Sequence, residues 1–119
     1  MVTKETLDNA LSAHALWKKR LQEAIENGKS DFQVSVVQKD TECQFGKWLY
    51  SVSEQEKTSD DFVKVKNLHA EFHKTAAEIL QLAINGDKVE ALKNIEMGGA
   101  YGRITGKLII ALNAWKSKI

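Results

Sequence analysis

The chain has 119 residues, of which 43% are hydrophobic and 28% charged, with no proline and a formal net charge of +1. This length predicts a single domain, residues 1–119, and the interleaved charges leave no patch for nucleic acid or for an anionic membrane surface. No stretch approaches the roughly 20 apolar residues of a membrane span, and a lone cysteine excludes an internal disulfide, so we expect a cytoplasmic protein.

The first predicted helix begins after Thr3, which can cap it, and ends at Asn27-Gly28, a typical stop signal. Apolar residues recur along it at steps of three and four, as on the buried face of an amphipathic helix. They are Leu7, Ala10, Leu11, Trp17, Leu21, Ala24 and Ile25. His14 lies on the same stripe, so we expect its ring to point into the protein.

The segment Lys29–Lys39 is harder to assign. Its apolar residues alternate only partly, and the sequence offers no partner strand, so we expect a loop that packs apolar side chains under the bundle. A short helix should then begin at Asp40 or Thr41 and run to about Tyr50. Cys43 would lie in its first turn, where free N–H groups and the helix dipole favour a thiolate.

A long helix is predicted next. Ser53 and Glu56 resemble a capping box, and Ser59 or Asp60 opens a helix that ends at Asn85-Gly86. Its heptad-like apolar stripe comprises Phe62, Val65, His69, Phe72, Ala76, Leu80 and Ala83. His69 and His73 are one helical turn apart, so both imidazoles should project from one inward face.

The last predicted helix is capped by Asp87 and Glu90 and runs close to the C-terminus, with two apolar stripes. One comprises Met97, Tyr101, Ile104, Leu108, Ala111 and Trp115; the other comprises Ile95, Gly98, Gly102, Gly106 and Ile109. Each glycine inside a helix costs about 1 kcal/mol relative to alanine, which close packing should offset. We expect one stripe to face the bundle and the other a second copy in a homodimer; the alternative is a fully internal helix.

These elements predict an all-α fold, a four-helix bundle with a short additional helix or loop that carries the cysteine. His14, Cys43, His69 and His73 are all the histidines and the only cysteine of the chain. Four such donors match the closed tetrahedral site that zinc takes. Taken singly, an inward histidine is often a core residue and a free cysteine a small buried hydrophobe, so a metal-free helical adaptor stays open.

Other histidine chemistries fit less well. A hemerythrin-like di-iron bundle needs more histidines and bridging carboxylates. A histidine phosphotransfer domain needs an exposed reactive histidine, whereas His73 is expected to face inward. The metalloprotease pattern His-Glu-x-x-His is absent because Ala70 follows His69. Four protein ligands also leave no coordination position for water, so we do not expect an enzyme.

Three stretches resemble the chemoreceptor zinc-binding (CZB) domain family: His14 with Trp17, the segment CQFGKW at 43–48, and the segment HAEFH at 69–73. The resemblance implies a four-helix bundle with one zinc held by His14, Cys43, His69 and His73. It also implies that the accompanying residues pack around the site; these are Trp17, Gly46, Trp48 and Phe72.

The same resemblance implies a regulatory module of bacterial signal transduction, in which zinc occupancy or thiol oxidation alters helix packing. Such modules are attached to chemoreceptors and to enzymes that synthesise cyclic-di-GMP. The expected partners are therefore a second copy of the chain and a signalling domain, a chemoreceptor or a diguanylate cyclase, in cis or in trans.

Overall fold

The computed structural model describes residues 2–96 and 98–119, and every regular element in them is helical. In chain order the elements are α1 (Lys4–Asn27), α2 (Val34–Val37), α3 (Gln44–Ser51), the 3-10 turn η1 (Glu56–Thr58), α4 (Asp60–Ile84), α5 (Lys88–Ile95) and α6 (Ala100–Lys116). The predicted all-α class is thus confirmed. No helix in the described part is long and apolar enough to cross a membrane.

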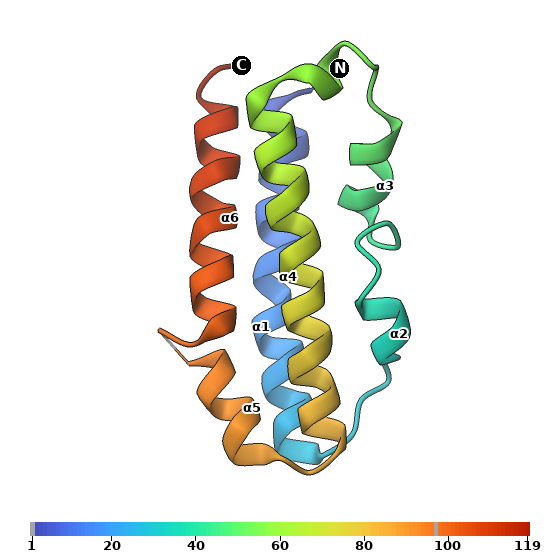
Figure 1. Cartoon of the computed structure of the whole chain (residues 1–119), viewed down its shortest axis with the longest axis vertical. Coiled ribbons are helices and arrows are strands. Elements are labelled where there is room, and N and C mark those ends of the chain that lie inside the picture. The colour runs from blue at the N-terminus through green and yellow to red at the C-terminus, as the bar shows by residue number, and fades with distance from the viewer. Residues whose placement is uncertain (1, 97) are drawn as a thin grey trace.

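Helix α4 is the centre of the bundle, since it contacts α1, α2, α5 and α6. Figure 1 shows α1 and α4 side by side, with α5 and α6 forming a third column and α2 and α3 a fourth. Helix α1 begins and α6 ends at the same end of the molecule. The fourth column carries the cysteine, which confirms the predicted bundle with a short cysteine-bearing element.

The two long helices begin and end as the sequence predicts. The Thr3 hydroxyl accepts the Thr6 N–H at 3.2 Å, and the Ser59 hydroxyl accepts the Phe62 N–H at 3.1 Å. Gly28 ends α1 in the left-handed conformation, with φ +70°. These caps fix where each inward stripe starts, and therefore where the histidines of α1 and α4 lie along the bundle.

The segment before α3 differs from the prediction in two respects. Residues 34–37 form a single helical turn, α2, rather than a loop; Val37 is buried, while Phe32 and Val36 stay exposed. Helix α3 begins at Gln44, not at Asp40 or Thr41, because the sulfur of Cys43 accepts the Gly46 N–H at 3.2 Å and so caps the helix. Cys43 is therefore the N-cap and not a residue of the first turn.

The prediction of one continuous last helix is wrong. Helix α5 ends at Ile95 and α6 begins at Ala100. Gly98 has a φ of +91°, which side chains with a Cβ rarely adopt, and a Cβ on Gly99 would collide with the carbonyls of Lys93 and Asn94. Gly98, which the sequence placed on a packing stripe, therefore makes a break together with Gly99. Asp87 occupies the N-cap position of α5, but its side chain makes no capping hydrogen bond there.

One apolar stripe of α6 is buried and the other is partly open. Tyr101, Ile104, Leu108, Ala111 and Trp115 are all buried; Met97, assigned to the same stripe, lies outside the described residues. On the second stripe Ile109 is 42% exposed, and the neighbouring Ile110 is 68% exposed. A Cβ on Gly106 would meet no described atom within 4 Å. The alternative of a fully internal last helix is therefore wrong.

We predict that Gly98→Ala destabilises the protein by about 1–2 kcal/mol, because alanine is strained at a positive φ. Gly106→Ala is the matched control: it adds the same methyl group inside a regular helix with open space around it, and it should stabilise by up to about 1 kcal/mol. Urea unfolding of dilute protein, followed by circular dichroism, measures both changes. Equal effects of the two substitutions would contradict the assignment of the break to Gly98.

Candidate metal centre

The structure brings together all four side chains that the sequence singles out. His14 comes from α1, Cys43 caps α3, and His69 and His73 lie one turn apart on α4. One donor atom from each lies within 4.8 Å of the others, and no carboxylate of the described residues joins this group. The three imidazoles are almost fully buried, at 5%, 0% and 2% exposure, whereas Cys43 is half-buried.

The shortest donor separations are close to those of a tetrahedral zinc site. The sulfur of Cys43 lies 3.3 Å from Nε2 of His69, which in turn lies 3.1 Å from Nε2 of His73. Zinc–nitrogen bonds of about 2.0–2.1 Å and zinc–sulfur bonds of about 2.3 Å place tetrahedral donors about 3.3–3.6 Å apart. The donor set therefore fits one such ion.

Two backbone carbonyls orient two of the rings. Nδ1 of His14 donates to the Ala10 carbonyl at 2.7 Å, and Nδ1 of His73 donates to the Val37 carbonyl at 2.9 Å. Because a carbonyl can only accept, Nδ1 carries the proton in both rings, and the neutral ring keeps a lone pair on Nε2. Nε2 of His14 is buried and has no hydrogen-bond partner among the described residues, as expected of an atom reserved for a ligand.

Burial keeps all three histidines neutral. Desolvation lowers the pKa of His14 to about 4 and that of His69 to about 2, and it also lowers the pKa of His73. The carbonyl hydrogen bonds of His14 and His73 oppose this shift only in part. A neutral imidazole is the form that binds a metal, so the site presents three ready nitrogen ligands at neutral pH.

Cys43 is a neutral thiol in this environment, contrary to the expectation that the helix start favours a thiolate. Burial raises its pKa and outweighs the N–H groups of Gly46 and Phe45, which lower it; the nearby Asp40 carboxylate raises it further. The thiol lies 3.9 Å from the Asp40 carbonyl. A metal ion at the site would change this balance, because a coordinating thiol loses its proton outright.

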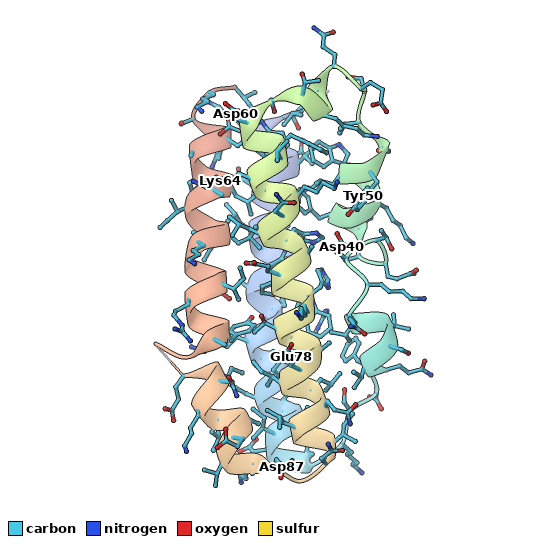
Figure 2. The ribbon with its side chains drawn as sticks, viewed as in Figure 1. Asp40, Tyr50, Asp60, Lys64, Glu78 and Asp87 are labelled. Carbon is cyan, nitrogen blue, oxygen red and sulfur yellow. The ribbon has the colours of Figure 1, made fainter. Side chains whose placement is uncertain are left out.

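A polar pair that sequence reasoning missed holds the cysteine segment. The Tyr50 hydroxyl donates to the Asp40 carboxylate at 2.7 Å, and this bond raises the pKa of Tyr50 to about 12. Figure 2 labels both residues beside α3. Gly46 completes the close contact, since a Cβ there would collide with the Asp40 carbonyl and lie 3.3 Å from Cε1 of His69. The backbone before Cys43 therefore lies directly on α3 and near α4.

Aromatic rings line the remaining sides of the cluster. The Phe72 ring lies 5.0 Å from the His14 ring, and the Phe45 ring lies 5.2 Å from the His69 ring, both edge to face. Trp48 stacks on Phe45, and Trp17 packs on Phe32 one shell further out. These rings separate the cluster from bulk water on the sides that they cover, which strengthens electrostatic interactions inside it.

A buried Cys/His3 cluster inside a helical bundle defines the class of small metal-binding helical domains. A family model described as the chemoreceptor zinc-binding domain matches residues 14–80, more than half of the chain and a span that contains all four donors. The chain therefore belongs to the CZB family, a family of regulatory and sensory domains. Neither a curated protein nor a solved structure matches the chain.

The lowered histidine pKa values predict that the zinc-free protein loses stability in acid. The unfolded chain takes up a proton on His14 below about pH 6.5, whereas the folded chain does so only near its pKa of about 4. Each such histidine should lower the free energy of unfolding by up to about 1.4 kcal/mol per pH unit in this window. The contribution of the neutral His14 to stability is thus fully present above pH 6.5 and is lost as the pH falls towards 4.

Urea unfolding in the presence of a chelator, at several pH values between 7.5 and 4.5, measures this slope. His14→Leu is the control, because it removes one histidine and leaves every carboxylate in place. The variant should show a shallower slope than the parent. Identical slopes would contradict the lowered pKa of His14.

Proposed function

We propose that this chain is a zinc-binding regulatory domain in which one ion is held by His14, Cys43, His69 and His73. The observation that carries the proposal is the convergence of one sulfur and three nitrogen donors within 4.8 Å. Four protein ligands would close the coordination shell and leave no position for an activated water. The proposed role is therefore structural and regulatory, not catalytic.

The rival metal and phosphotransfer functions have less support. A di-iron centre uses bridging carboxylates, and the donor group found among the described residues contains none. Phosphotransfer needs a histidine that a donor protein can reach, whereas His73 is 2% exposed. A metal-free adaptor would leave the buried Nε2 of His14 without a partner, at a cost of about 1–3 kcal/mol.

Zinc would connect parts of the chain that are distant in sequence. Its ligands belong to α1, to α4 and to the start of α3, and His73 is also bonded to the carbonyl of Val37 in α2. Loss of the ion would remove its bonds between Cys43 and the two long helices and leave the hydrogen bond from His73 to the Val37 carbonyl as a polar link. We propose that this change in helix packing is the signal, passed to a bacterial chemoreceptor or diguanylate cyclase in cis or in trans.

Oxidation of the thiol is a second proposed input. Hydrogen peroxide would oxidise the Cys43 thiol to a sulfenic acid and be reduced to water, which removes the thiolate ligand from the set. This input requires a thiol that starts reduced, and a reducing cytoplasm would maintain it. Cys43 is the one ligand of the four that is only half-buried, so an oxidant would meet it first.

The zinc content of the purified chain tests the proposal. We expect one zinc per chain, and we expect Cys43→Ala and His73→Ala to lose it, because a missing ligand opens the shell. Since binding of structural zinc is coupled to folding by on the order of 10 kcal/mol, both variants should also unfold at lower denaturant concentration.

The chain offers matched controls for this measurement. Glu42→Ala and Lys74→Ala change the exposed neighbours of the same two ligands and should keep full zinc content. Metal analysis by mass spectrometry and circular dichroism of each variant distinguish ligand loss from unfolding. Two irons per chain, or a folded parent without metal, would refute the zinc assignment.

We also propose that the domain forms a homodimer through the open strip of α6, defined by Gly102, Gly106, Ile109 and Ile110. Support comes from the exposure of the two isoleucines, 42% and 68%, beside a glycine that would accommodate close approach of another helix. Helix α6 contacts both α1 and α4, the helices that supply the three histidines. The strip is therefore the proposed route by which zinc occupancy affects assembly.

Sedimentation of the zinc-loaded protein should show a dimer that Ile110→Glu converts to a monomer, because burying a carboxylate in the interface is strongly unfavourable. Val89→Glu, on α5, is the control: Val89 is 67% exposed, almost the same as Ile110, but lies outside the strip. Removal of zinc should shift the dimer equilibrium. A monomeric parent, or equal effects of both substitutions, would rule out this interface.

A further inference from the structure

A cleft of about 340 Å³ opens between α1 and residues 32–45. Three of the four proposed ligands line it, namely His14, Cys43 and His73, whereas the fully buried His69 does not. The cleft thus connects the donor cluster with the surface from one side. Its volume is at the lower end of the range for small-molecule sites, so it has room for a hydrated ion and a compact ligand.

The walls of the cleft come from two separate parts of the chain. Ala13 and Trp17 of α1 form one wall, and Val36 of α2 contributes to the other. At one end the Trp17 and Phe32 rings pack at 5.2 Å, with the Arg20 guanidinium 5.0 and 5.1 Å from their centroids. This end is therefore narrowed by a contact between side chains of the two walls.

Charged side chains also line the cleft. Arg20 and Lys39 contribute two positive charges and Glu42 one negative charge, so the lining is net positive outside the ligands themselves. A positive lining attracts anions and raises their rate of encounter. A small molecule that carries zinc through carboxylate or thiolate groups matches this charge.

Neighbouring hollows give poorer access to the donors. The groove of about 200 Å³ between α1 and α6 is lined by His14 but by none of the other three ligands. The groove of about 210 Å³ between α1 and α3 is lined by none of the four. Ala13 and Ala15 flank His14 in sequence. Ala13 lines the cleft and also the α1–α3 groove, which none of the four ligands lines, whereas Ala15 lines the α1–α6 groove.

We propose that zinc enters and leaves its site through the cleft between α1 and residues 32–45, and that a small anionic chelator reaches the ion there. The proposal rests on the proposed function, that the four residues hold zinc. The ion meets His14, Cys43 and His73 from the cleft, and His69 completes the shell from the buried side. The side chains of the cleft walls thus set how fast the domain responds to a change in zinc supply.

Entry and exit of zinc through the cleft predict a kinetic effect that differs from the effect of disturbing a ligand. A side chain that narrows the cleft raises the barrier for entry and for exit equally, while the bound and free states stay the same. Both rates then fall by one factor and the dissociation constant does not change. A substitution that disturbs the ligands behaves differently, because it changes the dissociation constant.

The test measures zinc transfer from the loaded protein to a chromogenic pyridylazo chelator by stopped flow, together with the zinc dissociation constant. Ala13→Leu and Val36→Trp narrow the cleft from opposite walls and should each slow transfer several-fold. Ala15→Leu makes the same change on the same helix, also at an exposed position, and should leave the rate unchanged. Phe32→Ala removes the ring that packs on Trp17 and should speed transfer.

Slower transfer at unchanged affinity in either narrowing variant, together with a wild-type rate for Ala15→Leu, supports the path. The path is refuted if both narrowing variants transfer zinc at the wild-type rate. It is also refuted if their transfer rates change only together with the dissociation constant. The path is refuted as well if Ala15→Leu slows zinc transfer as much as the narrowing variants do, because zinc would then not pass preferentially through the cleft. A parent that binds no zinc refutes the proposed function as well, whereas a loaded parent with unaffected rates refutes only the path.

Discussion

The arrangement of the site depends on the hydrogen bonds that two histidines donate to backbone carbonyls. The bond from His14 to Ala10 lies within α1, whereas the bond from His73 to Val37 joins α4 to the single turn of α2. Each fixes the proton on Nδ1 and leaves the Nε2 lone pair free. The second bond also explains why α2 packs against α4. The carbonyl of Val37, the last residue of α2, has its buried partner on α4, and the Val37 side chain is buried as well.

Burial at this site has opposite effects on its two kinds of donor. It lowers the pKa of the three imidazoles and raises that of the Cys43 thiol, so the protein without a cation holds four neutral groups together, three of them almost fully buried. Nε2 of His14 and Nδ1 of His69 are buried there without partners among the described residues. Burying these unpartnered nitrogens lowers the stability of the fold. At His14, coordination of a cation by Nε2 would offset this loss.

The two long helices and the inward positions of their histidines could be predicted from the sequence, because Thr3 and Ser59 are side-chain caps and the histidines occupy helical periods. The position of Cys43 could not be predicted, since sulfur is an unusual N-cap and the contact of Gly46 with the Asp40 carbonyl is a tertiary one. The break between α5 and α6 could not be predicted, because a glycine at position 98 is compatible both with a helical packing stripe and with a left-handed turn. The Val37 carbonyl has no sequence signal, because every residue carries one.

The site and α6 are joined by aromatic contacts. Phe72 packs against the His14 ring at 5.0 Å and the His73 ring at 5.6 Å, and on its other side lies 5.5 Å from the Tyr101 ring of α6. Phe72 and Tyr101 are both buried and in direct contact, and both also line the groove between α1 and α6. If zinc occupies the site as proposed, a rotation of either histidine on its loss would displace Phe72, either against Tyr101 or into this groove. Tyr101 is one turn before Thr105 and Gly106, so a displacement of Tyr101 would arrive at the strip of α6 that the described residues leave open.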